Sequence, residues 1–223
     1  MAFSIVHKVA EADFPSRWGH FRIHGFTGLR DGESAEPGCD PSRTQQRQPE
    51  EMVALVLGDI HGQPPIVRIH SQCLTGDVFG SLRCDCRPQL ELALGKIAEA
   101  GAGILLYEQQ EGRGIGLMPK LQAYQLQDQG LDTVQANEHL GFKADCREFE
   151  LPAEVLKLLG VSEVRLITNN PDKVAALESA GIRVVERISA VVEPLESFEK
   201  YLQVKRDKLG HLHDDVELQR SKP

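Results

Sequence analysis

The sequence predicts an α/β fold, with a mixed, mostly parallel sheet, helices on both faces and antiparallel strands at the N-terminal end. Two observations support this class. In the later part of the chain, short runs of Val, Ile and Leu alternate with segments of helical periodicity, which is typical of parallel strands joined by helices. In the first third, strand-like runs follow one another without an intervening helix.

The first three strand-like runs lie at residues 19–26, 52–59 and 65–70. The last two are joined by a turn-like segment rich in glycine and proline, which predicts an early hairpin. Residues from about 30 to 50 are polar and contain almost no apolar anchor, so we expect a flexible surface loop there. The tail at 214–223 is also polar and is expected to fray.

Three helix–strand units follow. In the first, apolar residues recur at helical spacing from Leu90 to Ala98, and Gly101 ends the helix before a buried strand at 103–107. The other two units combine helices at 152–159 and 171–180 with strands at 164–167 and 182–185. We expect one domain over residues 1–223, with no room for a fused second domain.

Charge and composition narrow the choice of partners. The formal net charge of −8 would repel nucleic acid, so an anionic ligand must be held by a local group of Arg, Lys and backbone N–H donors. No apolar run approaches the length of a membrane span, and the first residues lack a signal-peptide pattern. We therefore expect a cytoplasmic protein with a small phosphorylated ligand, and neither nucleic acid nor membrane as a partner.

Three cysteines, Cys73, Cys84 and Cys86, lie within fourteen residues. A structural zinc site has four protein ligands, whereas three thiolates leave one position open for water. Zinc can lower the pKa of such a water towards neutrality, which is the chemistry of hydrolysis at a carbon centre. Buried apolar thiols and a redox dithiol are the alternatives. His70 is either a fourth ligand or a hydrogen-bonding neighbour.

The chain has five cysteines. An odd number with three clustered thiols favours metal binding in a reducing compartment over a disulfide framework. The pattern assigns no role to Cys39 or Cys146.

A glycine-rich segment from Glu111 to Gly116 follows the predicted strand at 103–107. Its glycines permit close backbone approach to a ligand, and Arg113 is suited to a phosphate or a base. The carboxylate of Glu111 can accept hydrogen bonds from N1–H and the 2-amino group of guanine, which would select guanine over adenine. An ordinary glycine-rich turn is the alternative.

The segment from Thr168 to Lys173 opens a predicted helix, where a hydroxyl, backbone amides and a lysine favour an anion site. A simple capped helix start is the alternative. Like the cysteine run and the glycine-rich segment, it follows a predicted strand. Parallel sheets bind ligands beyond the carboxyl ends of their strands, so the three motifs are expected to converge.

Two further features are ambiguous from pattern alone. Asp145 and Arg147 lie two residues apart in an aperiodic stretch and should point the same way, which favours a solvated surface ion pair. Tyr124 continues the helical spacing of Leu117 and Leu121, which places it in the core.

These motifs together closely resemble GTP cyclohydrolase II in residue type, order and spacing. The resemblance runs from about Val9 to His211, apart from the polar loop. The segments that carry it are Arg68–Asp77, Ser81–Cys86, Gln110–Leu117, Asp132–Asn137, Leu140–Arg147 and Leu166–Lys173.

The resemblance implies an enzyme that opens the imidazole ring of GTP. It would release formate and pyrophosphate and leave 2,5-diamino-6-ribosylamino-4(3H)-pyrimidinone 5′-phosphate, the first step towards riboflavin. It further implies zinc on Cys73, Cys84 and Cys86, Mg²⁺ with the triphosphate, and a homodimer.

The family's functional residues carry over onto matching positions of this chain. Asp145 falls on its proton acceptor, Arg147 on its proposed nucleophile, and Tyr124 on a tyrosine near the zinc-bound water, contrary to the core position that the pattern favours. A guanidinium stays protonated, so charge stabilisation is the alternative role for Arg147. The nucleotide contacts fall on Arg68, Ile69, His70, Ser71, Gln72, Gln89, Glu111, Gly112, Arg113, Thr133, Thr168 and Lys173.

The chain departs from the family pattern at two places. Gln72 stands where glutamate is usual, and Arg87–Pro88 follows Cys86 where glycine is common. Two other functions therefore compete with the complete reaction. One is a guanine-nucleotide-binding paralogue without turnover, and the other is a hydrolase that stops at the formamide or at pyrophosphate release.

Overall fold

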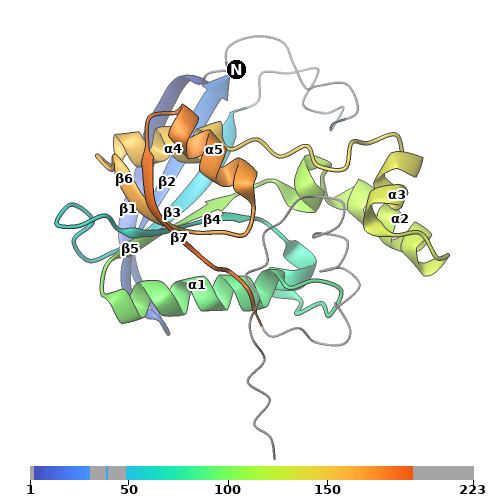
Figure 1. Cartoon of the computed structure of the whole chain (residues 1–223), viewed down its shortest axis with the longest axis horizontal. Coiled ribbons are helices and arrows are strands. Elements are labelled where there is room, and N and C mark those ends of the chain that lie inside the picture. The colour runs from blue at the N-terminus through green and yellow to red at the C-terminus, as the bar shows by residue number, and fades with distance from the viewer. Residues whose placement is uncertain (1–2, 31–38, 40–48, 193–223) are drawn as a thin grey trace, which may run out of the picture.

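The computed structural model describes residues 3–30, 39 and 49–192, which form a seven-stranded mixed sheet with helices on both faces (Figure 1). The strand order is β1-β2-β3-β5-β4-β6-β7. This arrangement confirms the predicted fold class. The tail at 214–223, and the polar loop apart from its two ends and Cys39, lie outside the described residues, and the single domain over 1–223 stays a prediction.

The N-terminal part of the sheet is antiparallel. β1 (Phe3–Ser16) pairs with β2 (Gly19–Arg30), which pairs in turn with β3 (Glu50–Leu57). The sequence did not predict β1, because this edge strand is mostly exposed and shows no buried, alternating face. Ile5 and Val9, for example, are 55% and 59% exposed. Backbone pairing with β2 holds β1 in the sheet.

The predicted hairpin between residues 52–59 and 65–70 is wrong. β5 (Gly103–Glu108) lies between β3 and β4 (Ile66–Ser71), antiparallel to the first and parallel to the second. Residues 66–70 are all buried, as expected of a central strand with neighbours on both sides. The turn at 58–64 therefore reverses the chain without pairing the strands that it joins.

Helices cover the two faces of the sheet. α1 (Cys86–Ala100) packs Ile97 against one face, and α4 (Glu150–Leu158) packs Leu156 against the other, beside α5 (Pro171–Ser179) (Figure 1). All three helices were predicted. α4 begins two residues earlier than expected because Pro152 fits in a first helical turn, where no backbone N–H is needed.

The parallel strands β5, β4 and β6 (Glu163–Ile167) all end at the same edge of the sheet, and β7 (Arg183–Ile188) completes it. Two helices, α2 (Leu117–Asp128) and α3 (Thr133–His139), stand beside this edge in Figure 1. α3 was not predicted, although Asp132 and Gln135 form a capping box at its start. No helix among the described residues is long and apolar enough to cross a membrane.

Candidate active site

The three predicted motifs converge on one cleft at the carboxyl ends of β4, β5 and β6. The cleft holds about 1090 Å³ of empty space, its open mouth included. All the predicted site residues line it except two. Ile69 is fully buried in β4, where its carbonyl oxygen accepts a hydrogen bond from Nζ of Lys173 at 2.9 Å. Asp145 is bound to the cleft residue Arg147.

The cleft at this edge of the sheet is lined by three cysteines that lie close together, Cys73, Cys84 and Cys86. Cys73 follows β4, and Cys86 is the first residue of α1, where the helix dipole favours a thiolate. The three Sγ atoms all lie within 4.8 Å of one another, and those of Cys73 and Cys84 are 3.7 Å apart. Tetrahedral zinc with bonds of about 2.3 Å requires sulfurs roughly 3.8 Å apart, so the cluster fits the ion.

The charges of the cluster also fit a cation. Hydrogen bonds from Cys84 and Cys86 hold the pKa of Cys73 well below its usual range. Its thiolate, in turn, raises the pKa of Cys84 to about 11, and the pKa of Cys86 is raised as well. Three adjacent thiolates thus repel one another unless a cation binds them. Zn²⁺ would remove this repulsion and keep all three sulfurs deprotonated.

Gly76 leaves the space that the sulfurs occupy. It lies in the π-helical turn η2 (Leu74–Val78), which Cys73 caps by accepting the Gly76 N–H on its sulfur at 3.4 Å. A Cβ at this position would lie 2.9 Å from Sγ of Cys84 and 3.1 Å from Sγ of Cys73. The turn therefore permits no side chain here without displacing the sulfur atoms.

Asp77 holds the backbone of Cys73 in place. Its carboxylate accepts hydrogen bonds from the backbone N–H of Cys73 at 3.0 Å and from the hydroxyl of Tyr107 at 2.8 Å, and it contacts Nε2 of His70 at 3.1 Å. Among the described residues, the cluster able to hold a metal contains only the three cysteines. His70 is thus a hydrogen-bonding neighbour, and burial lowers its pKa, so its imidazole stays neutral.

Tyr124 faces the cleft. It is half-buried, and its hydroxyl lies 3.2 Å from Oγ1 of Thr75, within the turn that follows Cys73. The core position favoured by its helical spacing is therefore wrong. Burial raises the pKa of Tyr124, so the phenol stays protonated. Lys120, one helical turn earlier on α2, also enters the cleft and was missed by sequence reasoning, although its spacing from Tyr124 was a usable signal.

The glycine-rich segment forms the short helical turn η3 (Glu111–Gly114). Gly112 and Arg113 both have a φ of 61°, and Arg113 is the one non-glycine residue with positive φ in the described part of the chain. Glu111 accepts hydrogen bonds from Leu74 N at 2.6 Å and from Nζ of Lys120 at 2.7 Å. The carboxylate thus ties this turn to the loop that runs from Cys73 to Cys86, called the cysteine loop from here on.

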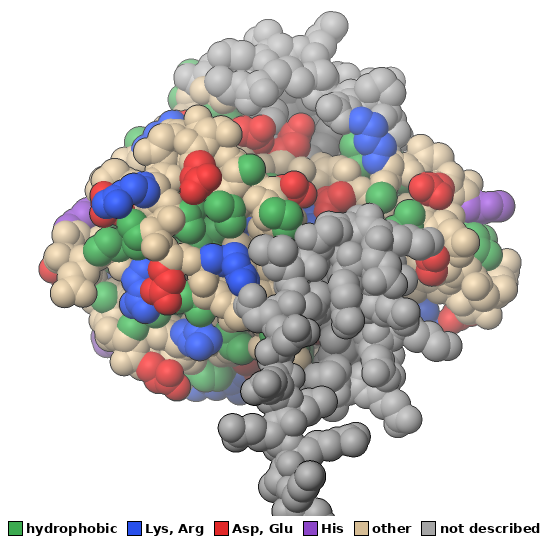
Figure 2. All heavy atoms as spheres, in the orientation of Figure 1, with side chains coloured by type: hydrophobic (Ala, Val, Ile, Leu, Met, Phe, Trp, Pro, Cys, Tyr) green, Lys and Arg blue, Asp and Glu red, His purple; other side chains and the backbone are tan. Residues whose placement is uncertain are grey.

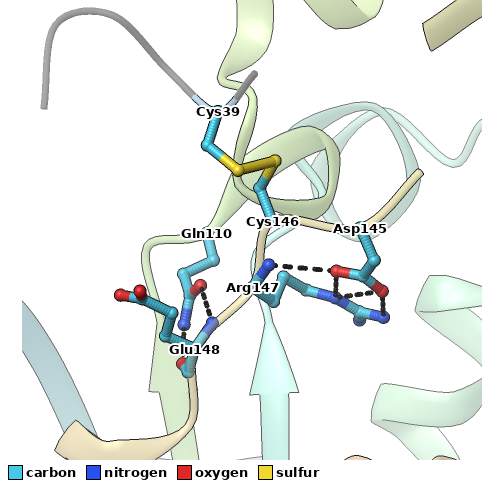
Figure 3. The surroundings of a disulfide bond; sticks show 6 residues. All are labelled: Cys39, Gln110, Asp145, Cys146, Arg147 and Glu148. Carbon is cyan, nitrogen blue, oxygen red and sulfur yellow. Dashed lines mark hydrogen bonds and ion pairs between the residues drawn. A yellow bond between two sulfur atoms is a disulfide. The ribbon is translucent and has the colours of Figure 1, made fainter. Parts of the chain in front are cut away.

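Asp145 and Arg147 form a bidentate ion pair, with contacts of 2.9 Å at Nε and 2.5 Å at Nη2 (Figure 3). The pattern had favoured a solvated surface pair, and this is wrong, because the side chains of Asp145 and Arg147 are only 25% and 12% exposed. Burial raises the pKa of Asp145, but the charge and hydrogen bonds of Arg147 outweigh it and lower the pKa overall. Asp145 therefore stays ionised and keeps Arg147 charged.

The irregular segment that carries this pair is fastened to the glycine-rich turn. Cys146 N donates to Arg113 O at 2.9 Å, and the side-chain amide of Gln110 bonds both backbone groups of Glu148 (Figure 3). Gly114 has the φ of +87° that this contact requires, and a Cβ there would lie 2.7 Å from Cys146 O. The catalytic candidates thus sit on a loop braced by backbone contacts.

A disulfide joins Cys39 to Cys146, between Asp145 and Arg147 (Figure 3). The sequence pattern assigned no role to these two cysteines and did not predict the disulfide, while the other three cysteines are free. The two cysteines lie 107 residues apart in sequence, and their proximity arises only from the fold. The bond ties the connection between β2 and β3 to the segment of the ion pair.

Two buried cations form the floor of the cleft. Arg68 donates to Ile167 O at 3.1 Å and to Oε1 of Gln89 at 2.7 Å, and burial lowers its pKa to about 10. Lys173, 4% exposed, donates to Ile69 O, and burial lowers its pKa. The start of α5 is capped by Asn170, so the segment from Thr168 is both a capped helix start and a wall of the cleft.

The cleft as a whole is basic, although the protein is acidic and the face drawn in Figure 2 mixes acidic with basic side chains. One carboxylate, Glu111, lines it, against six basic side chains: Arg68, Arg83, Arg113, Lys120, Arg147 and Lys173. This local excess matches the expectation that an anionic ligand is held by a small group of cations rather than by the overall field.

Comparison with known proteins agrees with the geometry. The family model described as GTP cyclohydrolase II matches residues 7–189. The chain belongs to the GTP cyclohydrolase II family. It is 53% identical over 206 residues to the GTP cyclohydrolase-2 proteins of Enterobacter sp. (strain 638) and of Escherichia coli O9:H4 (strain HS), covering 92% of this chain and 96% of each relative.

A solved structure is also similar, but only remotely. It is the two-domain 3,4-dihydroxy-2-butanone 4-phosphate synthase RibBX from A. baumannii, with a TM-score of 0.41 and 16% identity. The match covers 83% of this chain and 40% of that one. Membership of the GTP cyclohydrolase II family rests on the sequence comparisons alone.

Gly76→Ala is expected to weaken zinc binding by about tenfold or more, because the added methyl displaces two of the three sulfurs. Competition with a chromophoric chelator measures the affinity. Gly25→Ala is the matched control, since a Cβ at Gly25 meets nothing within 4 Å. Equal zinc affinity in both variants would contradict the close packing of the cluster.

Cys39→Ser is expected to lower the free energy of unfolding by about 2–4 kcal/mol, because it opens a long covalent loop in the unfolded chain. Urea unfolding, with and without a phosphine reductant, measures the change. The reductant should bring the wild-type protein to the stability of the variant and leave the variant unchanged. A wild-type stability that ignores the reductant would show that the disulfide does not form.

Proposed function

We propose that this chain opens the imidazole ring of GTP and releases formate and pyrophosphate. The product would be 2,5-diamino-6-ribosylamino-4(3H)-pyrimidinone 5′-phosphate, the first intermediate on the route to riboflavin. One observation carries the proposal: three clustered cysteine thiols, a tyrosine hydroxyl and a charged Asp–Arg pair meet in a single basic cleft of a GTP cyclohydrolase II family member.

The cations of the cleft would bind the triphosphate. Arg68 and Lys173 hold fixed positions on its floor through backbone carbonyl groups, and Arg113 approaches from the glycine-rich turn. Such preorganised charges bind phosphate oxygens without a further ordering cost. Mg²⁺ would accompany the triphosphate, since this ion is usually bound through phosphate oxygens, waters and few protein groups.

The cysteine cluster would serve the ring-opening steps. Cys73, Cys84 and Cys86 would hold zinc, which would supply a Lewis acid able to make water nucleophilic at neutral pH. Tyr124 keeps its proton because of burial, and its hydroxyl reaches the turn after Cys73. It is placed to orient water or to pass a proton as C8 of the base leaves as formate.

Asp145 and Arg147 would serve the phosphate end of the substrate. A guanidinium held by an ionised carboxylate stays protonated and has no free lone pair, so we assign Arg147 to charge stabilisation rather than to nucleophilic attack. Asp145 fixes the orientation of that guanidinium. Release of pyrophosphate develops charge on the transferring group, which a preorganised cation stabilises.

The proposal includes selection of guanine by Glu111, provided that its carboxylate has an acceptor site open to the base. The Glu111 carboxylate already accepts three hydrogen bonds, from Gly112 N and Lys120 Nζ on Oε1 and from Leu74 N on Oε2. Each carboxylate oxygen has two acceptor sites, so one site on Oε2 remains for a guanine N–H, and a second guanine hydrogen bond would have to replace one of the present donors. Gln72, in place of the usual glutamate, lines the cleft and retains hydrogen-bonding groups. A homodimer remains an expectation from the family resemblance, and a cytoplasmic location remains an expectation from the sequence composition.

The test is to incubate zinc-loaded protein with GTP and Mg²⁺ and to follow formate, pyrophosphate and the pyrimidine by mass. Both small products should appear together, and Cys84→Ser should abolish both. Arg147→Gln should lower kcat by about 10²–10³-fold, because it removes a preorganised charge. Arg165→Gln is the control, since Arg165 pairs with Glu186 on the exposed surface of the sheet.

The other outcomes distinguish the competing functions. Pyrophosphate with an intact or formyl-bearing base would mean a truncated reaction. GTP that binds but yields no product would favour a nucleotide-binding paralogue.

A further inference from the structure

The ammonium group of Lys120 lies at the centre of the cysteine loop. Its Nζ is 3.1 Å from Sγ of Cys73, 2.9 Å from Oγ1 of Thr75 and 2.7 Å from Oε1 of Glu111. A lysine ammonium has three hydrogens, and each of these acceptors can take one. Lys120 thus has its donor capacity filled by the protein, although it lines the cleft.

The position of Lys120 answers a charge problem in the loop. Three thiolates on a dication carry a net charge of −1, and Glu111 adds a second negative charge within the same few ångströms. The side chains of Lys120 and Glu111 are only 11% and 9% exposed, so water screens these charges poorly. Lys120 provides the compensating positive charge.

Lys120 also reaches Tyr124 by two routes. Thr75 accepts a hydrogen bond from Lys120, and its hydroxyl lies 3.2 Å from that of Tyr124. The ammonium further lies 5.6 Å from the centroid of the Tyr124 ring, one helical turn along α2. One side chain therefore contacts a metal ligand and sets the neighbourhood of the phenol.

The glycine-rich turn makes room for this arrangement. A Cβ on Gly112 would lie 3.1 Å from Cβ of Lys120, and the positive φ of Gly112 favours glycine there. Glu111 in the same turn receives one of the Lys120 hydrogens. The turn thus holds the lysine against the cysteine loop as well as bordering the cleft.

We propose that Lys120 is a positioning residue that couples the thiolate of Cys73 to Tyr124 and Glu111. Its N–H···S hydrogen bond withdraws electron density from the sulfur and so strengthens the Lewis acidity of a metal bound there. Its contact with Thr75 fixes the Tyr124 hydroxyl for its part in hydrolysis. This inference rests on the proposed function for its catalytic consequence, whereas the contact with the metal ligand can be tested independently.

The test replaces Lys120 by methionine, which has a similar length and no charge, in protein loaded with Co²⁺ or Zn²⁺. In the Co²⁺ form, loss of the N–H···S bond should move the thiolate-to-metal charge-transfer band to longer wavelength. In the Zn²⁺ form, kcat should fall by about 10- to 100-fold. KM for GTP should change less than threefold, as roughly expected when every Lys120 hydrogen already has a protein acceptor.

Lys157→Met is the matched control. Lys157 lies on α4 with an exposed side chain paired to Glu154, and its replacement should leave both the band and kcat at wild-type values. Lys120→Arg retains the charge but presents a planar fork, so it should recover part of kcat and move the band less than methionine does. Lys120→Gln tests the same band if the methionine variant does not fold.

Two results would overturn the proposal. A wild-type charge-transfer band and kcat in the neutral variants would show that Lys120 does not act on the cysteine loop. A raised KM with unchanged kcat would show that it contacts the substrate instead. If the wild-type protein itself released neither formate nor pyrophosphate, the proposed function would fail, and the band alone would still decide the contact with Cys73.

Discussion

The repulsion among three closely spaced thiolates is the constraint on which the rest of the site depends. Their sulfurs lie too close together for all three to ionise without a cation, and no side chain fits beside them at Gly76. The groups around the cluster position its sulfurs or offset their charge. Asp77 fixes the backbone of Cys73, the start of α1 favours the thiolate of Cys86, and Lys120 places a positive charge against the sulfur.

The sheet explains why chemistry from distant parts of the chain meets here. β4, β5 and β6 run parallel and end at one edge, so the segments that follow them share a cleft. The cysteine loop follows β4, the glycine-rich turn follows β5, and the Thr168 segment follows β6. The ion-pair loop joins them through the backbone contact between Cys146 and Arg113. The site is thus assembled by topology and braced by backbone hydrogen bonds.

Sequence reasoning found what short-range spacing encodes. The Cys-x-Cys pair with a lone upstream cysteine predicted the cluster, and the alternation of strands and helices predicted convergence at the strand ends. It missed features that depend on tertiary neighbours. The strand β1 has no buried face to give a pattern. β5 lies between β3 and β4, and the turn that joins those two strands does not reveal this. The Cys39–Cys146 disulfide joins residues 107 positions apart.

Zinc K-edge X-ray absorption on the purified protein would show directly whether three cysteine sulfurs bind the metal. We expect one zinc per chain with three sulfur ligands at about 2.3 Å and one lighter ligand. Cys73→Ser should reduce the sulfur count by one. Four sulfur ligands would mean a closed structural site, and a first shell of nitrogen and oxygen alone would place the metal elsewhere. Either result would contradict a three-thiolate centre with an open position.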